Sequence, residues 1–144
     1  MPSFSQHSHQ AEHNQELLTL LAKQDLCKKF SDWYVTISFY SSVHYVEGII
    51  NKIGKFYVKD ETIYEKNSES IKHSYGVNSE HQARKLLMKD NIKIFAKIYN
   101  AHQTLYEMSR TARYKCHHPE GHNYINVEKC LNDVNNEFIR ITKQ

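Results

Sequence analysis

The fold is decided by residues 91–114, whose sequence is NIKIFAKIYNAHQTLYEMSRTARY. Apolar residues recur there at steps of three and four, which is the spacing of one face of an α-helix. Asp90 or Asn91 can begin this helix, and Pro119 ends it by about His117, because the residue before a proline avoids helical geometry. We therefore expect one long amphipathic helix over 91–114, with a buried stripe comprising Ile94, Ile98, Ala101, Leu105, Met108 and Ala112.

Helical spacing continues on both sides of this stretch. Phe39, Val46 and Ile50 mark the buried stripe of a helix that precedes it, and Asn78 or Ser79 can cap a shorter one between them. Short connections favour antiparallel neighbours, so the sequence predicts an all-α, up-and-down bundle of four or five helices. The expected helices cover residues 14–30, 32–53, 80–89, 91–114 and about 126–143.

Two segments lack this periodicity. Residues 1–13 are polar, and we expect them to form a flexible N-terminal arm before a single domain over 14–144. Residues 54–79 are broken by Gly54 and Gly76, and we expect one long irregular excursion there, in which residues 55–64 can form a short hairpin.

Composition narrows the classes of function. The 144 residues make one domain, and no apolar run is long enough to cross a membrane. Three widely spaced cysteines fit a reducing, cytoplasmic location better than a disulfide framework. The four glycines are scattered, so that no phosphate loop or dinucleotide fingerprint exists and no cofactor is expected. A net charge of +3, with ten histidines besides, permits an anionic partner.

Arg110 and Arg113 are the basic residues that most suggest binding. They share one helical face with His117, because residues three and seven apart lie on the same side of a helix. Arginine forks suit bidentate recognition of phosphate. The alternative is a pair of surface arginines that stabilise the C-terminal end of a helix.

A second stripe on the 32–53 helix passes from apolar to polar, as a stripe does when it leaves the core for a cleft. It consists of Trp33, Ile37, Tyr40, His44 and Glu47. His44 and Glu47 are three residues apart, which resembles one arm of a metal site in a helical bundle. A hydrogen-bonded polar cluster that fixes the register of the helices explains the same residues.

Histidines elsewhere suggest metals more weakly. Cys116, His117, His118 and His122 surround Pro119 and could form a zinc site, although the usual ligand spacing is missing. The N-terminal histidines could likewise bind a metal, but nothing fixes their geometry. We therefore expect no metal site.

Several segments together resemble small bacterial and archaeal proteins of the HEPN superfamily. The first runs from Trp33 through Phe39-Tyr40 and His44 to Glu47. The second is His81-Gln-Ala-Arg84, and the third comprises Tyr99, Leu105 and the run Ser109-Arg110-Thr-Ala-Arg113-Tyr114. Their order and rough spacing match over about residues 14–143, which is nearly the whole chain.

This resemblance implies a four- to five-helix bundle, often a homodimer. It implies either a metal-independent endoribonuclease of a toxin–antitoxin or other defence system, or a non-catalytic binding or scaffold version. The catalytic signature of the family is an Arg, four to six residues and then a His. Four residues separate Arg113 from His118, and six separate Arg110 from His117, so these are the expected catalytic pairs.

The other residues that match the family are expected to bind the ligand or to support the catalytic residues. If the helices over 32–53 and 91–114 are neighbours, their polar side chains converge on one cleft, which Arg84 can enter. These side chains are Tyr40, His44 and Glu47 on the first helix and Ser109 and Arg113 on the second. Positive groups would then outnumber the Glu47 carboxylate, and a phosphate-sized anion would balance them. The alternative is that Arg113 pairs with Glu47 and no uncompensated positive charge remains for an anion. The expected supporting residues are Tyr40, His44, Glu47, His81, Arg84, Ser109 and Tyr114.

Three functions follow as expectations. The first is an RNA- or nucleotide-binding protein, with ribonuclease activity if an Arg–His pair forms. The second is a non-catalytic interaction or scaffold module, and the third a His/Glu metal-binding bundle. A homodimer is expected because Phe95, Tyr99 and Tyr106 make a stripe that is too aromatic for open solvent. An antitoxin or defence partner is a further expectation from the resemblance.

Overall fold

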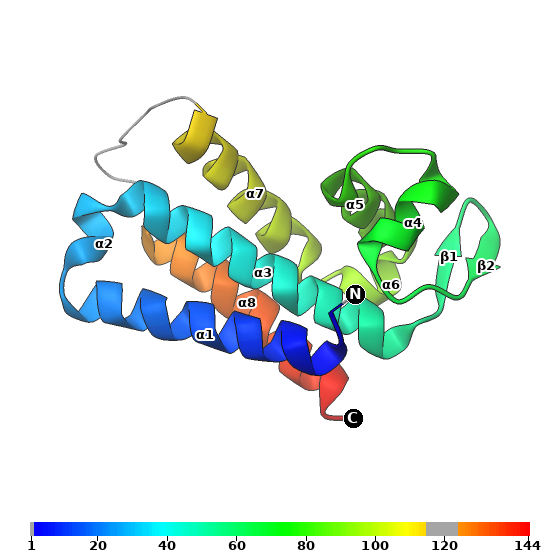
Figure 1. Ribbon diagram of the computed structural model, residues 1–144, viewed down its shortest axis with the longest axis horizontal. Coiled ribbons are helices and arrows are strands. Elements are labelled where there is room, and N and C mark those ends of the chain that lie inside the picture. Colours follow the sequence, from blue (N-terminus) through cyan, green and yellow to red (C-terminus); the bar gives the residue numbers. More distant parts are fainter. Residues whose placement is uncertain (1, 115–123) are drawn as a thin grey trace.

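Four long helices build an up-and-down bundle in the computed structural model, which describes residues 2–114 and 124–144. The central helix packs against the other three, and successive long helices run in opposite directions (Figure 1). The expected all-α bundle is therefore confirmed. Its helices are α1 (Phe4–Lys23), α3 (Ser31–Ile53), α7 (Tyr99–Tyr114) and α8 (Tyr124–Thr142), with α3 in the centre. Within the described residues, no helix is both long and apolar enough to cross a bilayer.

The first helix begins at Phe4, so the expected flexible arm over residues 1–13 is wrong. The Ser3 hydroxyl accepts the Gln6 backbone N–H, and the Gln6 side chain accepts the Ser3 N–H, which together form a capping box. Ala11 is fully buried and its carbonyl accepts the Ser41 hydroxyl of α3 at 3.1 Å. The polar N-terminal sequence is thus a helix with one narrow buried edge. A short helix, α2 (Leu26–Lys29), connects it to α3.

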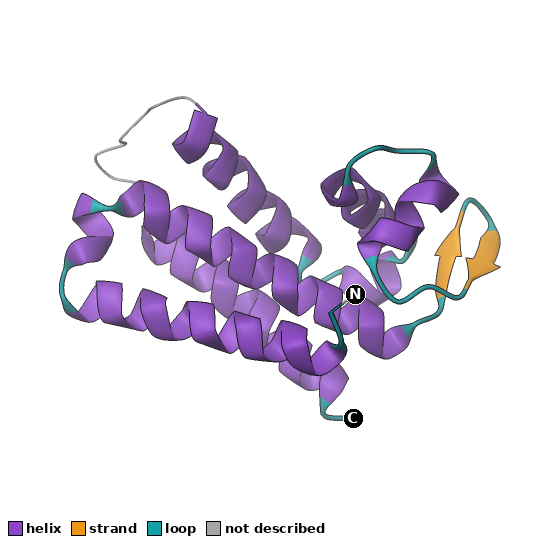
Figure 2. Cartoon of the chain, viewed as in Figure 1, coloured by secondary structure: helices purple, strands orange, loops and turns teal. Residues whose placement is uncertain are grey.

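The excursion after α3 is largely regular, which corrects the expectation of an irregular segment over 54–79. A hairpin forms where residues 55–64 allowed one, and Lys59 and Asp60 in its turn both have positive φ. Asn67 then caps a helix by accepting the Ser70 N–H at 2.9 Å. These elements lie at one end of the bundle (Figure 2). They are β1 (Phe56–Val58), β2 (Glu61–Ile63), α4 (Ser68–Tyr75), α5 (Glu80–Asp90) and α6 (Ile92–Phe95).

The expected single helix over 91–114 is two helices, α6 and α7. The Asn91 side chain accepts the Tyr57 N–H and donates to the Tyr57 carbonyl, each at 2.8 Å, so the start of this segment is fixed to strand β1. The Ile98 N–H bonds to the Phe95 carbonyl three residues back, which tightens the chain between the helices. Phe95 is consequently buried against Phe56, with ring centroids 6.3 Å apart.

The expected core stripe over 91–114 is only partly buried. Ile98, just before α7, and Leu105 are fully buried, while Ile94 of α6 and Met108 are half-buried against the same core. The short helix α5 begins with its expected cap, because the Ser79 hydroxyl accepts the Gln82 N–H. It buries Ala83 and Leu87, and it carries His81 and Arg84 toward α3 and α7.

Candidate functional site

The second stripe of α3 is exposed at its apolar end and buried at its polar end, opposite to the expectation. Trp33 is 60% exposed and Tyr40 45%, whereas Glu47 is only 6% exposed. The reason is pairing: a buried carboxylate is stable when cationic and hydrogen-bonding groups surround it. Such groups come from α4 and α5, which no periodicity within α3 could reveal.

Glu47 and Arg84 form a buried ion pair. Arg84 Nη1 lies 2.8 Å from Glu47 Oε1, and Glu47 also accepts the backbone N–H and the hydroxyl of Ser68 at the start of α4. Glu47 therefore joins three helices and caps one of them from outside. Within residues 2–114 and 124–144, the buried Arg84 Nε has no hydrogen-bond partner, and the Glu80 carboxylate lies 3.9 Å from Arg84 Nη1. The expectation that Arg113 pairs with Glu47 is wrong, because Arg84 takes that place.

His44 faces His7 of α1. The two Nδ1 atoms are 3.1 Å apart, so one imidazole donates to the other. Burial lowers the pKa of both rings, and the charge of His7 lowers that of His44 further. Within the described part of the chain, no three His, Cys, Asp or Glu side chains are grouped so as to hold a metal ion. His44 and Glu47 thus serve two different contacts, which does not support the metal arm.

Arg113 contacts α3 through Tyr40. Its Nη1 donates to the Tyr40 hydroxyl at 3.1 Å, its Nε donates to the Ser109 carbonyl at 3.3 Å, and its guanidinium lies over the Tyr40 ring at 5.6 Å. Ser109 is fully buried, and its hydroxyl has no hydrogen-bond partner in the part of the chain that the structure describes. The expected approach of α3 and α7 therefore brings Tyr40 to Arg113 but leaves His44 and Glu47 to other partners.

His81 of α5 lies against the aromatic rings of α3 and α7, and several cations act on it. Its ring stacks on Tyr106 with centroids 3.3 Å apart, and Arg110 lies over the same Tyr106 ring at 5.7 Å. Burial, together with the smaller effect of the charges of Arg84, Lys85, Arg110 and Arg113, lowers the pKa of His81 to about 4. Neither ring nitrogen has a hydrogen-bond partner among the described residues. Below, the name "basic face" denotes Tyr40, His81, Tyr106, Arg110 and Arg113.

A buried contact between α3 and α7 was not expected. His102 Nδ1 lies 2.6 Å from the Ser42 hydroxyl, both side chains are fully buried, and burial holds the pKa of His102 well below its usual value. Its ring also packs against Phe39, which contacts Tyr40, His81 and Tyr106 as well. The available signal was the position of His102 on the aromatic stripe of its helix. His102 stiffens the support beneath the basic face.

Several expected site residues are not tested. His117 and His118 lie outside the described residues, as do Cys116 and His122, and the side chain of Tyr114 is not described either. Phe95, one of the three aromatic residues from which a homodimer was expected, is buried within the chain. Tyr99 and Tyr106 are half-buried.

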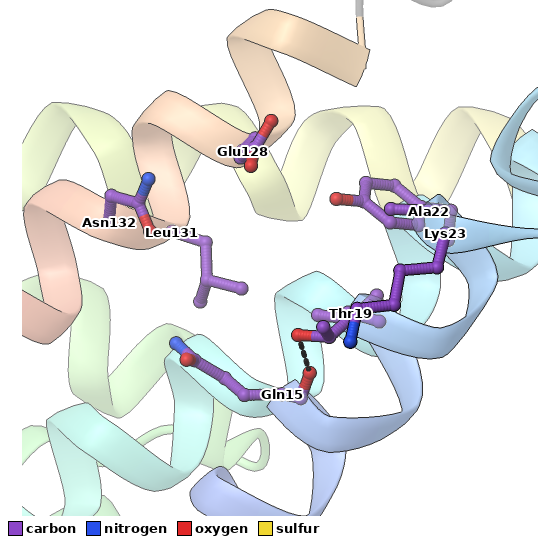
Figure 3. Close-up of a pocket in the computed structure, with 9 residues that line it drawn as sticks. Gln15, Thr19, Ala22, Lys23, Glu128, Leu131 and Asn132 are labelled. Carbon is purple, nitrogen blue, oxygen red and sulfur yellow. Dashed lines mark hydrogen bonds between the residues drawn. The ribbon is translucent and has the colours of Figure 1, made fainter. Parts of the chain in front are cut away.

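A separate cavity of about 190 Å³ lies between α1, α3 and α8 (Figure 3). Gln15 and Thr19 of α1 face Leu131 and Asn132 of α8 across it, and no described residue bonds to the buried Gln15 amide nitrogen. Ligand pockets usually measure about 300–1,000 Å³, so this cavity is small for a cofactor or substrate. It shares no residue with the basic face.

Comparison of the chain with protein-family models, with curated proteins and with solved structures found no match.

Proposed function

We propose that the protein is a HEPN-like helical bundle that binds RNA or a nucleotide through its phosphate groups at the basic face. The observation that carries the proposal is the placement of two guanidinium groups against one aromatic cluster: Arg110 lies over the Tyr106 ring, and Arg113 lies over the Tyr40 ring. Two neighbouring cations on one face create a field that favours an anion. Arginine is also the side chain best suited to bidentate contact with a phosphate.

The contacts of Arg113 support a binding role. The Tyr40 hydroxyl and the Ser109 carbonyl both accept hydrogen bonds from the guanidinium, so Arg113 is held at the basic face. Arg84 points away from this face, with its Nη1 on the buried Glu47 carboxylate. We therefore assign phosphate contact to Arg110 and Arg113, and a structural role to Arg84.

Ribonuclease activity is a further prediction that depends on His117 or His118. Cleavage without a metal needs a group that moves the proton of the ribose 2′-hydroxyl, and its pKa should lie near the working pH. His81, with a pKa of about 4, and His102, which is fully buried, do not meet this requirement. In the ribonuclease hypothesis, Arg113 with His118, or Arg110 with His117, carries the reaction.

The other expectations remain predictions. These are a homodimer, an antitoxin or defence partner, and a cytoplasmic location. Each concerns the surroundings of the protein, whereas the phosphate-binding proposal concerns residues of one chain. It can accordingly be tested on the purified protein alone.

The test is to titrate a fluorescently labelled, unstructured RNA with the protein in EDTA and follow anisotropy. We expect saturable binding that Arg113→Ala weakens about tenfold, since a phosphate contact from arginine is a charge-assisted hydrogen bond. Lys129→Ala is the matched control, because it removes one positive charge from an exposed position on α8. Equal affinity of the wild type and Arg113→Ala would contradict the proposal.

Cleavage is scored on the same samples. The expected products carry 2′,3′-cyclic phosphate ends, and His118→Ala or His117→Ala should abolish them without abolishing binding. Binding without cleavage would leave the phosphate site standing and remove the ribonuclease hypothesis.

A further inference from the structure

Exposed aromatic rings form a row along the start of α3. Phe30 is 40% exposed, Trp33 60% and Tyr40 45%. Phe30 directly precedes α3, whereas Trp33 and Tyr40 are seven residues apart within it and share one face, with the half-buried Ile37 between them. The name "aromatic row" denotes Phe30, Trp33 and Tyr40. It ends at Tyr40, the residue that contacts Arg113.

Positive charge accompanies the aromatic row at both ends. Lys29 Nζ lies 5.5 Å from the centre of the Phe30 ring, and the Arg113 guanidinium lies 5.6 Å from that of Tyr40. Asp32 is rotated by about 100° from Trp33 around the helix, so its carboxylate lies off this face. An occupant of the row therefore meets flat apolar rings bordered by cations.

This combination fits one class of ligand. Proteins that bind single-stranded nucleic acid pair a positively charged path for the backbone with aromatic rings on which unpaired bases stack. The bases of a duplex are already stacked on each other and are not available to such rings. An acidic peptide would satisfy the cations but would leave the rings without flat partners.

We propose that Trp33 and Tyr40 are a stacking platform for the unpaired bases of single-stranded RNA. The inference rests on the proposed function, because the phosphates of that strand would lie at the basic face beside Tyr40. Seven residues of helix separate the two rings by about 10 Å along the axis, so they cannot serve the same base. The platform consequently selects a strand of several nucleotides over a mononucleotide.

Trp33 supplies its own reporter, because it is the only tryptophan in the chain. We expect a short oligouridylate to quench the Trp33 fluorescence, with a midpoint that matches the one from anisotropy of the labelled strand. Uridine monophosphate and an RNA duplex should quench far less at the same concentrations. Light scattering of the free and RNA-bound protein is recorded in parallel.

Variants separate stacking from charge. Trp33→Ala should weaken binding of the oligouridylate about tenfold, and Trp33→Phe should recover most of the loss, since base–aromatic stacking tolerates any large ring. Tyr64→Ala is the matched control, because Tyr64 is 72% exposed after strand β2 and is not part of the row. Trp33 is exposed, so its replacement should leave the thermal unfolding temperature nearly unchanged.

The outcomes are distinct. Wild-type affinity of Trp33→Ala, with unquenched Trp33 fluorescence and a weakened Arg113→Ala, would overturn the platform while the phosphate site stood. A Trp33→Ala protein that binds RNA normally but changes from dimer to monomer would also overturn it, and would show that a second copy covers the row. Absence of any RNA binding would overturn both proposals. Quenching with a tenfold loss in Trp33→Ala would support the platform.

Discussion

Arg84 Nη1 donates to Glu47 Oε1 at 2.8 Å, with 7% of the arginine side chain and 8% of the glutamate side chain exposed. The pair joins α5 to the central helix of the bundle. Because Glu47 also accepts two hydrogen bonds from Ser68, the same carboxylate holds the start of α4. The buried ion pair thus helps to hold both α4 and α5, the helix that carries His81, against the bundle.

Glu47→Gln should lower the free energy of unfolding by about 3–5 kcal/mol, since removal of one partner leaves the other charge buried and unpaired. Urea denaturation provides the measurement. Glu80→Gln is the matched control, because the Glu80 carboxylate is half-exposed and lies 3.9 Å from the same Arg84 Nη1. Its change should stay below about 1 kcal/mol. Equal losses of unfolding free energy in the two variants would mean that the buried ion pair contributes no more to stability than the exposed carboxylate.

Leu105→Ala should cost about 2–5 kcal/mol, because Leu105 is fully buried at the centre of α7 and its truncation leaves a cavity. Leu20→Ala serves as control, since 53% of Leu20 is exposed on α1, and it should cost less than about 0.5 kcal/mol. Both values come from urea midpoints. A loss below about 0.5 kcal/mol for Leu105→Ala would show that the core stripe of α7 is assigned wrongly.

The protein should lose stability as the pH falls below about 6.5, the pKa of an unfolded histidine. Burial lowers the pKa values of His7 and His44 in the folded chain and lowers that of His81 to about 4. The unfolded state therefore binds more protons in this range, and the loss grows until the pH passes the lowered values. Urea denaturation at several pH values between about 7.5 and 4 measures it.

His44→Gln should reduce this pH dependence, whereas replacement of the exposed His73 by Gln should not. The comparison uses the difference in unfolding free energy between the two ends of the pH range, so that any constant effect of a substitution cancels. An unchanged difference in His44→Gln would show that the contact between His7 and His44 does not govern the acid response.

Tyr40→Phe should weaken RNA binding by roughly two- to tenfold, the equivalent of one hydrogen bond, because it removes the hydroxyl that holds Arg113 Nη1. The ring remains, so stacking is kept. Fluorescence anisotropy measures the affinity, and Tyr57→Phe on the exposed side of β1 is the control. Wild-type affinity of Tyr40→Phe would mean that Tyr40 does not position the guanidinium.

Local chemistry in the sequence predicted part of this arrangement well. Three predicted features that follow from the local sequence pattern are present. They are the Ser79 cap, the hairpin over 55–64 and the burial of Ile98 and Leu105. The helical start at Phe4 depends on local chemistry too. That helix was missed because the segment is polar: a capping box starts it, and its buried edge consists only of His7, Ala11 and Leu18.

Contacts between distant elements could not be predicted in the same way. Asn91 looked like a helix cap, but its side chain bonds to Tyr57 of β1, and the helix over 91–114 is interrupted after it. Glu47 was expected near Arg84 as part of an open cleft, yet the two side chains form a buried ion pair. In both cases a polar side chain is satisfied by a partner more than thirty residues away.

The central claim is that Arg113 contacts an RNA phosphate, and the salt dependence of binding tests it most directly. The slope of log affinity against log salt concentration reports the number of phosphates neutralised, so loss of one contact should reduce it by about one. We predict that Arg113→Ala shows this reduction together with a roughly tenfold weaker affinity, while Lys129→Ala keeps the wild-type slope. An Arg113→Ala protein with the wild-type slope and affinity would contradict the account.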